Sequence, residues 1–394
     1  MKKVVLLIFI TLFFPLLCFG MAPKPICIDG FNPGGCQLEN STGVSVSITG
    51  DINTDEGAAI TIRGGSDNTL TSSGNINVVE DVLSSGVQLD NTSGNRVTIN
   101  GDINIFGERG GLLAEGIFVV DDSYDNTIQT GNITISGEQD AVGIFIENWS
   151  NSSLGNTIQT GDITISGGDD GGFGIYLFGA WNDTIVTGNI SIEDPFAAGI
   201  IVEQSRGVSI QVNGDISLIG GDTVAIGLED SDSTSITVSG DITTAHDAIE
   251  VIGDSDSNTI NINGQISANA GDDAAIYVDS TSDNNTFTLN QGSVIDGRLH
   301  NDGSNNTLTF NLGRAASYNF TTSGAVNWVL DDTTKTVIAG SAKSRGVADM
   351  DDAGNRLYQR LSQINSSLTN QQRQTRQGQA RGDYWIDSYY TDSE

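Results

Sequence analysis

One tripeptide, Gly followed by Asp, Asn or Gln and then Ile, recurs nine times and restricts the fold of this chain more than any other feature. The spacing between copies is about 24 to 30 residues, and self-similarity at such a period is typical of solenoids. The glycines are Gly50, Gly74, Gly101, Gly131, Gly161, Gly188, Gly214, Gly240 and Gly264. The matching isoleucines are Ile52, Ile76, Ile103, Ile133, Ile163, Ile190, Ile216, Ile242 and Ile266.

Each repeat contains three short runs that are typical of β-strands. The first follows a polar turn, as in residues 125–130, and the second contains the tripeptide, as in residues 161–167. The third is a small residue followed by an apolar run, as in residues 143–146, 174–177 and 275–278. Because alternate side chains of a strand point to opposite faces, one set in each run is expected to lie inward.

Other repeat folds fit this pattern less well. Gly, Asn and Asp interrupt every apolar run, which disfavours helices, and the leucine framework of leucine-rich repeats is absent. A propeller blade needs about 40 or more residues. We therefore predict an all-β fold, a parallel β-helix with three strands per coil and about 9–10 coils, whose inward Ile and Val side chains pack from coil to coil.

Asn-Thr pairs are expected to occupy equivalent corners of successive coils. Stacked Asn side chains there would form a hydrogen-bonded ladder, although Asn is also simply a good turn former. The pairs lie at residues 68/69, 126/127, 156/157, 258/259, 285/286 and 306/307.

The first 20 residues have the features of a secretory signal. Lys2 and Lys3 precede an apolar core, residues 4–17, which is too short for a confident membrane span. Cleavage is expected after Gly20, and the leucine before Cys18 disfavours a lipoprotein. Export favours a disulfide between Cys27 and Cys36 that closes the N-terminal end, over a metal site with no histidine nearby.

The repeat period breaks near residue 305. Aromatic strand-like runs at 307–310, 317–320 and 327–330 fit a cap on the last coil. Apolar residues from Val347 to Leu368 then recur at steps of three and four, which predicts an amphipathic helix. The expected segments are a signal (1–20), an N-terminal cap (21–43), the β-helix (44–304), the aromatic cap (305–342), a helical linker (343–382) and the start of a barrel (383–394).

This order of segments resembles the autotransporter family along the whole chain. The most telling stretch runs from Val347 to Leu368 and is followed by Tyr384 and Trp385, which resemble the pore helix and the first barrel strand of that family. The resemblance implies a passenger secreted through an outer-membrane barrel. Such a barrel needs roughly 250 further residues. The chain by itself is therefore expected neither to anchor nor to translocate itself, and a truncated reading frame, a shortened clone and a split gene all stay open.

The net charge of −33 limits the partners, and the excess of acid lies upstream of Ser341. Such a surface repels nucleic acid and anionic lipid, so we exclude both as direct partners. We expect membrane contact only through a barrel outside these residues. The signal predicts an exported protein at the cell surface, in the outer membrane or outside the cell.

Our first functional hypothesis is a non-enzymatic passenger, an adhesin or a structural surface rod, with no cofactor, metal or catalytic residue. Its partner would be a host glycan, a surface protein or another copy of the chain. Aromatic residues at similar offsets in adjacent repeats would form an exposed patch, although core packing would explain some of them equally well. They are Phe145, Trp149, Tyr176, Phe178 and Trp181.

The alternative is a β-helical enzyme that cleaves polysaccharides, a glycoside hydrolase or lyase. Asn53-Thr54-Asp55 and Asp169-Asp170 match two elements of the polygalacturonase-like signature, but the other two elements are missing. We expect His246 and His300 to be exposed or in turns. Asp-rich turns at 168–171 and 254–256 are better explained as solvated turns than as calcium sites, and Arg381-Gly382-Asp383 as a coincidence.

Overall fold

The computed structural model describes residues 30–31, 35–55, 57–80, 83–107, 113–137, 140–149, 155–167, 171–268, 274–290, 295–310, 317–319, 321–323, 329–331, 335–338 and 341–344. These residues belong to two compact units. Unit 1 comprises residues 1–187 and 192–194, and unit 2 comprises residues 188–191 and 195–394.

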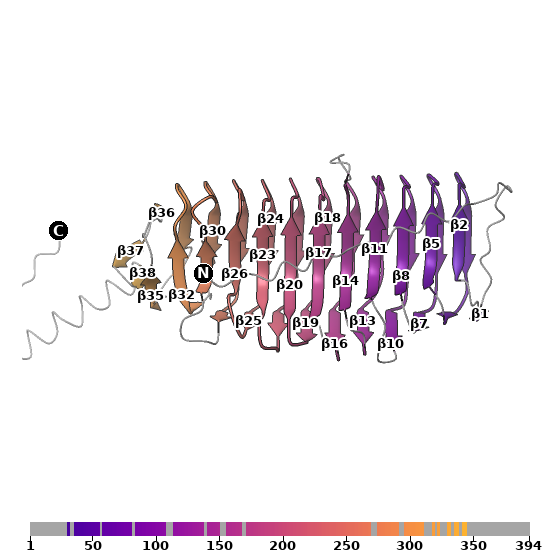
Figure 1. Cartoon of the computed structure of the whole chain (residues 1–394), viewed down its shortest axis with the longest axis horizontal. Helices are drawn as coiled ribbons and strands as arrows, with labels where there is room; N and C mark the ends of the chain where they lie inside the picture. The colour runs from indigo at the N-terminus through magenta and orange to yellow at the C-terminus, as the bar shows by residue number, and fades with distance from the viewer. Residues whose placement is uncertain are drawn as a thin grey trace, which may run out of the picture. The chain divides into compact units, whose positions relative to one another are not determined.

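The chain folds as a parallel β-helix of about nine turns with three parallel sheets, which confirms the predicted fold class. In unit 1 each coil contributes one strand to each sheet (Figure 1). Sheet I contains β1 (Gly30–Phe31), β4 (Ile52–Thr54), β7 (Ile76–Glu80), β10 (Ile103–Gly107), β13 (Ile133–Ser136) and β16 (Ile163–Ser166). Sheet II contains β2 (Cys36–Glu39), β5 (Gly57–Arg63), β8 (Leu83–Asp90), β11 (Leu113–Val120), β14 (Asp140–Glu147) and β17 (Gly171–Phe178). Sheet III contains β3 (Ser45–Ile48), β6 (Thr69–Ser72), β9 (Arg96–Ile99), β12 (Thr127–Gln129), β15 (Thr157–Gln159) and β18 (Thr184–Thr187).

Unit 2 has sheets of the same three kinds, to which we give the same labels, and β19 (Ile190–Glu193) of sheet I contains residues of both units. Sheet I here contains β22 (Ile216–Leu218), β25 (Ile242–Thr244), β28 (Ile266–Ala268) and β31 (Ile295–Asp296). Sheet II contains β20 (Ala197–Glu203), β23 (Val224–Glu229), β26 (Ile249–Ile252), β29 (Ala274–Val278), β32 (Arg298–Asn301) and β35 (Thr321–Ser323). Sheet III contains β21 (Ser209–Val212), β24 (Ser235–Val238), β27 (Thr259–Ile262), β30 (Thr286–Leu289), β33 (Thr307–Phe310) and β36 (Val329–Asp331).

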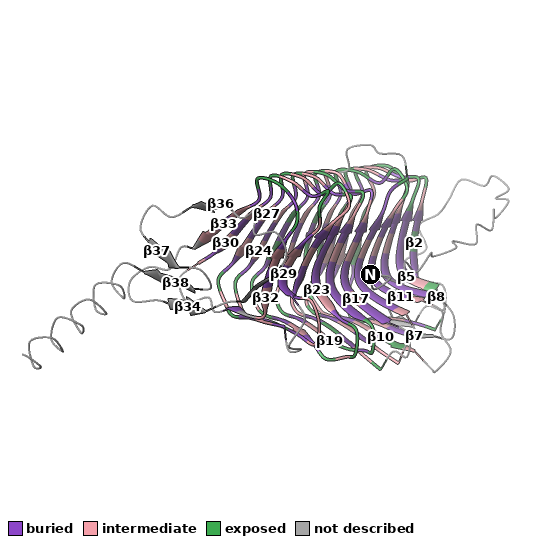
Figure 2. Ribbon diagram, turned by 60° about the vertical axis from the view of Figure 1, so that its left-hand side comes forward, coloured by how far each residue is buried: buried purple, intermediate pink, exposed green. Residues whose placement is uncertain are grey.

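The isoleucine of each repeated tripeptide points into the coil. Ile52 is 2% exposed and the other eight are fully buried, among them Ile133 and Ile216 (Figure 2). The pairing register brings these isoleucines together, because Ile103 pairs with both Ile76 and Ile133. A single coil could not cover such side chains, so stacking removes their apolar surface from water and stabilises the solenoid.

Packing between coils explains the polar residue of the tripeptide. The side-chain Oδ1 of Asp102 accepts the N–H of Asn132 at 2.7 Å, and Asn132 Oδ1 accepts the N–H of Asp162 at 2.8 Å. In unit 2 the same bond joins Asp215 to the N–H of Asp241 at 2.8 Å. A Cβ atom on the preceding Gly131 would collide with Asp102 Oδ1 and with the carbonyl of Gly101, so only glycine fits.

The predicted asparagine ladder is present at the corner before sheet III. The Nδ2 of Asn68 donates to Asn95 Oδ1 at 2.9 Å. In the same way, Asn95 Nδ2 donates to Asn126 Oδ1 at 2.9 Å, and Asn126 Nδ2 donates to Asn156 Oδ1 at 3.1 Å. Asn95 was missed because Arg, not Thr, follows it. The last position of unit 1 is Asp183, whose Oδ1 accepts the N–H of Asn156 at 2.7 Å.

Unit 2 has the same corner, where the side-chain Oδ1 of an asparagine accepts a backbone N–H, as Asn126 Oδ1 accepts the N–H of Asn95 at 3.0 Å in unit 1. In unit 2, Asn258 Oδ1 accepts the N–H of Thr234 and Asn285 Oδ1 accepts the N–H of Asn258, both at 2.8 Å. The residue before the ladder position has a left-handed backbone in these coils, with φ of 59° at Ser257 and Asn284 and 57° at Asn305. This conformation favours Gly, Asn, Asp and Ser, which explains the polar residue ahead of each Asn-Thr pair.

The aromatic runs after residue 305 are divided between two kinds of sheet. β33 and β36 add parallel strands to sheet III, and β35 pairs with β32 in sheet II. β34 (Ser317–Asn319), β37 (Lys335–Ile338) and β38 (Ser341–Ser344) instead form a small antiparallel sheet. Of the aromatic runs in the expected cap, those at 307–310 and 327–330 therefore overlap the parallel strands β33 and β36. The run at 317–320 overlaps β34 of the antiparallel sheet.

Several predictions concern residues outside the described ranges. These are the signal (1–20), the helix from Val347 to Leu368 and the barrel start (383–394). Cys36 is disulfide-bonded and 2% exposed, while Cys27, its predicted partner, lies outside those ranges. Where the structure describes the chain, no helix has the length and apolarity that crossing a bilayer requires.

Candidate functional site

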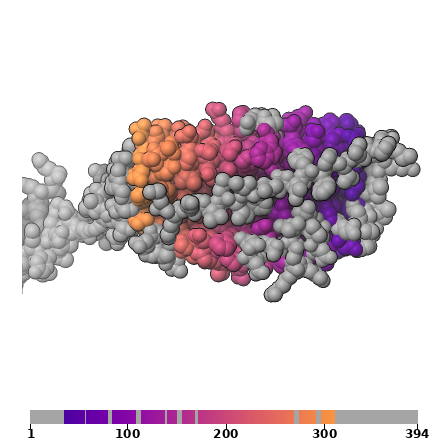
Figure 3. Space-filling view, in the orientation of Figure 1, coloured from indigo at the N-terminus to yellow at the C-terminus, as the bar shows by residue number. Residues whose placement is uncertain are grey.

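The outward face of sheet II gathers the most chemically distinctive side chains. In β14, Phe145 follows the buried Ile144 and points outward, and we call the positions of sheet II that lie in register with Phe145 the outer column. In unit 1 the column contains Phe118, Phe145 and Tyr176, which the parallel register places next to one another. The side chains of successive described coils lie against one another in the space-filling view (Figure 3).

The three aromatic rings of the unit 1 column form a stack. The ring centroids of Phe118 and Phe145 are 5.2 Å apart with an interplanar angle of 17°, and Phe145 and Tyr176 are also 5.2 Å apart at 4°. Phe173 joins the stack at 5.4 Å from Tyr176. Because the spacing of coils is about 4.8 Å, equivalent rings meet nearly face to face. Their edges, rather than their inner faces, remain available to a partner.

A second aromatic pair lies beside this stack. Trp149, just after β14, is 64% exposed, and its ring lies 4.5 Å from that of Phe178 with an angle of 53°. The indole Nε1–H donates to Glu147 Oε1 at 2.9 Å. Burial of Glu147 raises the pKa of its carboxyl, the bond from Trp149 lowers it, and the nearby Asp121 raises it further. We call Trp149, Phe178 and Glu147 the aromatic corner.

The structure therefore divides the predicted aromatic patch. It brings Phe145 to Tyr176 and Trp149 to Phe178, in two separate contacts. Trp181 is half-buried, and its carbonyl accepts the N–H of Gly155 at 3.1 Å. Sequence reasoning missed Phe118, although Gly116-Ile117-Phe118 has the same pattern as Gly143-Ile144-Phe145. That pattern is the signal that would have identified it.

In unit 2 the outer column begins with Ile201 and Gly227 and becomes polar from Glu250 onward. Gly227 pairs with Glu250, Glu250 with Tyr277, and Tyr277 with His300. His300 stacks on Tyr277 with centroids 5.0 Å apart, and its Nε2 lies 2.9 Å from Asp302 Oδ2. Burial, followed by the negative charges of Asp247 and Glu229, raises the pKa of Glu250 to about 7. Burial and the charge of Asp279 also raise the pKa of Tyr277.

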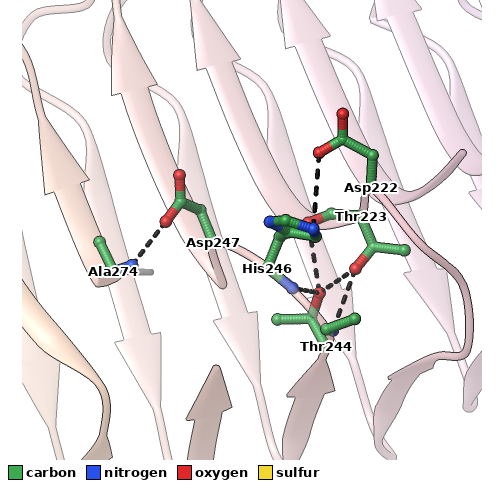
Figure 4. Close-up of polar contacts among 7 residues, drawn as sticks. Asp222, Thr223, Thr244, His246, Asp247 and Ala274 are labelled. Carbon is green, nitrogen blue, oxygen red and sulfur yellow. Dashed lines mark hydrogen bonds and ion pairs between the residues drawn. The ribbon is translucent and has the colours of Figure 1, made fainter. Parts of the chain in front are cut away.

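His246 lies in the turn between β25 and β26 (Figure 4). Its Nε2 is 3.9 Å from Asp222 Oδ1, and its side chain is 32% exposed. The hydroxyls of Thr223 and Thr244 bond to each other and are both 1% exposed. The Oδ1 of Asp247 accepts the N–H of Ala274. Because the threonine hydroxyls are buried and engaged, this network closes the turn and does not present a nucleophile to a substrate.

Of the residues that match the polygalacturonase-like signature, the structure describes Asn53, Thr54 and Asp55. The side-chain Oδ1 of Asn53 accepts Nδ2–H of Asn77 at 2.8 Å, Thr54 is buried, and Asp55 is exposed just after β4. Asp169 and Asp170 lie outside the described ranges. The structure therefore gives Asn53 a structural role between coils.

The Asp-rich turns have structural bonds as well. Asp256 Oδ1 accepts the N–H of Asp283 at 2.7 Å, and Asp254 donates its own N–H to Asp230 Oδ1 at 3.1 Å. The described residues contain no group of three or more His, Cys, Asp or Glu side chains placed to hold a metal ion. The turn at 168–171 is described only at Gly171, and the Arg-Gly-Asp tripeptide at 381–383 is outside the described residues.

No protein-family model matches the chain, and none of the curated proteins matches it. The fold and the outward face of sheet II are therefore the features from which a function can be inferred.

Proposed function

We propose that this chain is the β-helical passenger of an exported protein of the autotransporter kind, and that it acts without catalysis as an adhesin or structural element at the cell surface. The observation that supports adhesion best is the outward aromatic surface of unit 1. It combines the stack of Phe118, Phe145 and Tyr176 with Trp149, which is 64% exposed. Contiguous apolar patches at a protein surface often mark interaction sites, and here the exposed Trp149 adjoins half-buried rings.

The regularity of the coil supports a scaffold role. The repeated residues hold neighbouring coils together. The glycines allow close backbone contact, the asparagines form hydrogen-bonded ladders and the isoleucines pack inside the coil. The outward positions of sheet II are free to vary without disturbing these contacts. A partner would be a host glycan, a surface protein or a second copy of the chain. Function in such a fold belongs to the grafted surface rather than to the scaffold.

Binding of the full chain, purified after export from a bacterial host, to host cells and to a glycan array tests adhesion. We expect Trp149→Ala to weaken binding at least tenfold. Phe106→Ala is the matched control, because Phe106 is 44% exposed in sheet I. Absence of binding to cells, glycans and the chain itself would refute the adhesin function, as would equal losses in both variants.

Fractionation tests export separately. We expect the full chain to reach the periplasm or the medium and to begin after Gly20, as mass spectrometry of the N-terminus would reveal. Replacement of Lys2 and Lys3 by Glu would reduce export, since the basic end of a signal assists its insertion. Cytoplasmic retention of the unchanged chain would contradict the export proposal.

A second candidate function, polysaccharide cleavage, is favoured by one observation in unit 2. Glu250, whose pKa burial and neighbouring carboxylates raise to about 7, lies in one column with Tyr277 and His300. A carboxyl with such a pKa is suited to general acid catalysis near neutral pH. The test is turnover on a panel of polysaccharides. Activity that is lost in Glu250→Gln but retained in Asp55→Asn would support this alternative, and the absence of any turnover would refute it.

A further inference from the structure

The aromatic corner combines two ring systems with a carboxylate. The rings of Trp149 and Phe178 meet at 53° with centroids 4.5 Å apart, so they are neither parallel nor stacked like the neighbouring column. Since Trp149 is 64% exposed, a large part of its indole surface faces solvent. Such a pair presents ring faces to a ligand, which the stack of Phe118, Phe145 and Tyr176 does not.

Glu147 places a carboxylate at the edge of the aromatic corner. Glu147 pairs in register with Phe178, and its Oε1 receives the indole N–H of Trp149 at 2.9 Å. This bond orients the carboxylate beside the indole ring. Glu147 is only 8% exposed.

The charges around Glu147 are negative. Asp121 is the charged neighbour that acts on it, and burial acts in the same direction, so that both raise the pKa of the carboxyl. Among the described residues, the ion pairs of unit 1 include Arg63 with Asp90 and none with Glu147. A partly desolvated carboxylate without a cation gains free energy when a positive charge arrives.

We propose that Trp149, Phe178 and Glu147 form a binding site for an alkylammonium group. Ring faces attract cations electrostatically, and the carboxylate supplies the opposite charge. A neutral sugar can donate hydroxyl hydrogen bonds to Glu147, but only a cation adds a Coulomb attraction to the carboxylate and an attraction to the ring faces. The group would belong to an amino sugar, a lysine side chain or a quaternary ammonium headgroup, and all of these share the chemistry that the corner recognises.

This inference deepens the proposed adhesin function by naming the ligand chemistry, and it rests on that function only for its biological meaning. The probes are tetramethylammonium chloride and methylammonium chloride, with sodium chloride at equal ionic strength as the reference. They are titrated into the full chain, and the NMR signal of the Trp149 indole N–H is followed. Stronger binding of the tetramethyl probe would indicate a quaternary headgroup, and stronger binding of the methyl probe a primary amine.

We expect a saturable shift of that signal with at least one ammonium probe and none with sodium. Glu147→Gln should weaken binding at least tenfold while the Trp149–Phe178 pair persists. Glu39→Gln is the matched control, because Glu39 also ends a strand of sheet II in unit 1 but pairs in register with Arg63 instead of Phe178. In the unchanged chain, binding should weaken as the pH falls and Glu147 becomes protonated, which tests the carboxylate without any substitution.

Two results would overturn the site: no saturable shift with either probe, or binding that is equal in Glu147→Gln and insensitive to pH. Failure of the adhesin function is a distinct result. Ammonium binding without adhesion to cells or glycans would support the ammonium site and refute the adhesin function. Adhesion without ammonium binding would support the adhesin function and refute the ammonium site.

Discussion

The two units place different chemistry on the same kind of strand. The outer column of sheet II contains Thr61, Gln88, Phe118, Phe145 and Tyr176 in unit 1, and Ile201, Gly227, Glu250, Tyr277 and His300 in unit 2. The inward isoleucines, such as Ile144 and Ile249, are fully buried in both units. The comparison shows that the coil dictates the inward residue and leaves the outward residue open to a different function in each unit.

The corner before sheet III differs between the units in a second way. In unit 1 the amide ladder runs through Asn126 and Asn156 and then meets Asp183, whereas unit 2 retains asparagine at Asn258, Asn285 and Asn306. In unit 2 the Nδ2 of each of these asparagines donates to a backbone carbonyl of the preceding coil, at 2.7 to 2.9 Å. A carboxylate has no such donor. Unit 1 therefore ends its ladder with a group that cannot repeat the bond unless it is protonated.

The largest expected effect tests whether the inward faces of the two units are equivalent. Ile133→Ala in unit 1 and Ile242→Ala in unit 2 should each lower the free energy of unfolding by about 2–5 kcal/mol, because each leaves a cavity between coils. Denaturant unfolding of the full chain measures this. The outward neighbours Thr134→Ala and Thr243→Ala serve as controls and should cost less than about 1 kcal/mol. If the outward substitutions lowered the free energy of unfolding as much as the inward ones, the claim that the inward face dominates stability in both units would be wrong.

The next effect concerns the end of the unit 1 ladder. Burial raises the pKa of Asp183 from its ordinary 3.8 to about 7, although its bonds with Asn156 lower it. Its Oδ2 is buried and has no hydrogen-bond partner among the described residues. The stability that the protonated group contributes is therefore complete below about pH 4 and is lost as the pH rises through about 7.

Asp183→Asn should restore the missing donor and remove this pH dependence. At pH 8 we expect the free energy of unfolding to rise by roughly 2–4 kcal/mol, since each pKa unit corresponds to about 1.4 kcal/mol. At pH 4 the gain should nearly vanish. Asp55→Asn, at an exposed position, is the control and should leave both values unchanged. A variant that is less stable than the unchanged chain at pH 8 would contradict this assignment.

Much of the fold could be predicted because the coil repeats its physical requirements. The inward Ile and the Asn corner recur with the same local sequence, so that one coil predicts the next. The same logic fails where equivalent positions contain different residues. Asn95 escaped notice because Arg96 follows it, and Asp183 because an acid replaces the amide.

The outward surface was harder to predict because its contacts depend on register between coils. Phe145 and Tyr176 are 31 residues apart, and only the pairing of β14 with β17 places their rings in contact. Trp149 lies in a turn, where strand alternation gives no direction for a side chain. For the same reason, the sequence placed Trp149 in one patch with Phe145, Tyr176, Phe178 and Trp181, whereas the structure shows a ring contact of Trp149 with Phe178.

The smallest expected effect sharpens the contrast between the outer columns. Because burial and the charges of Asp247 and Glu229 raise the pKa of Glu250 to about 7, its ionisation opposes folding above that pH. Glu250→Gln should therefore raise the free energy of unfolding at pH 8 by about 1 kcal/mol, a value reduced by solvent screening, and should have little effect at pH 4. Phe145→Leu, in the column of unit 1, should instead cost about 1 kcal/mol at both pH values, since stacked rings do not titrate. Unfolding curves at the two pH values separate these outcomes. A pH-dependent loss in Phe145→Leu, or a pH-independent change in Glu250→Gln, would mean that the two columns do not differ in the way their side chains indicate.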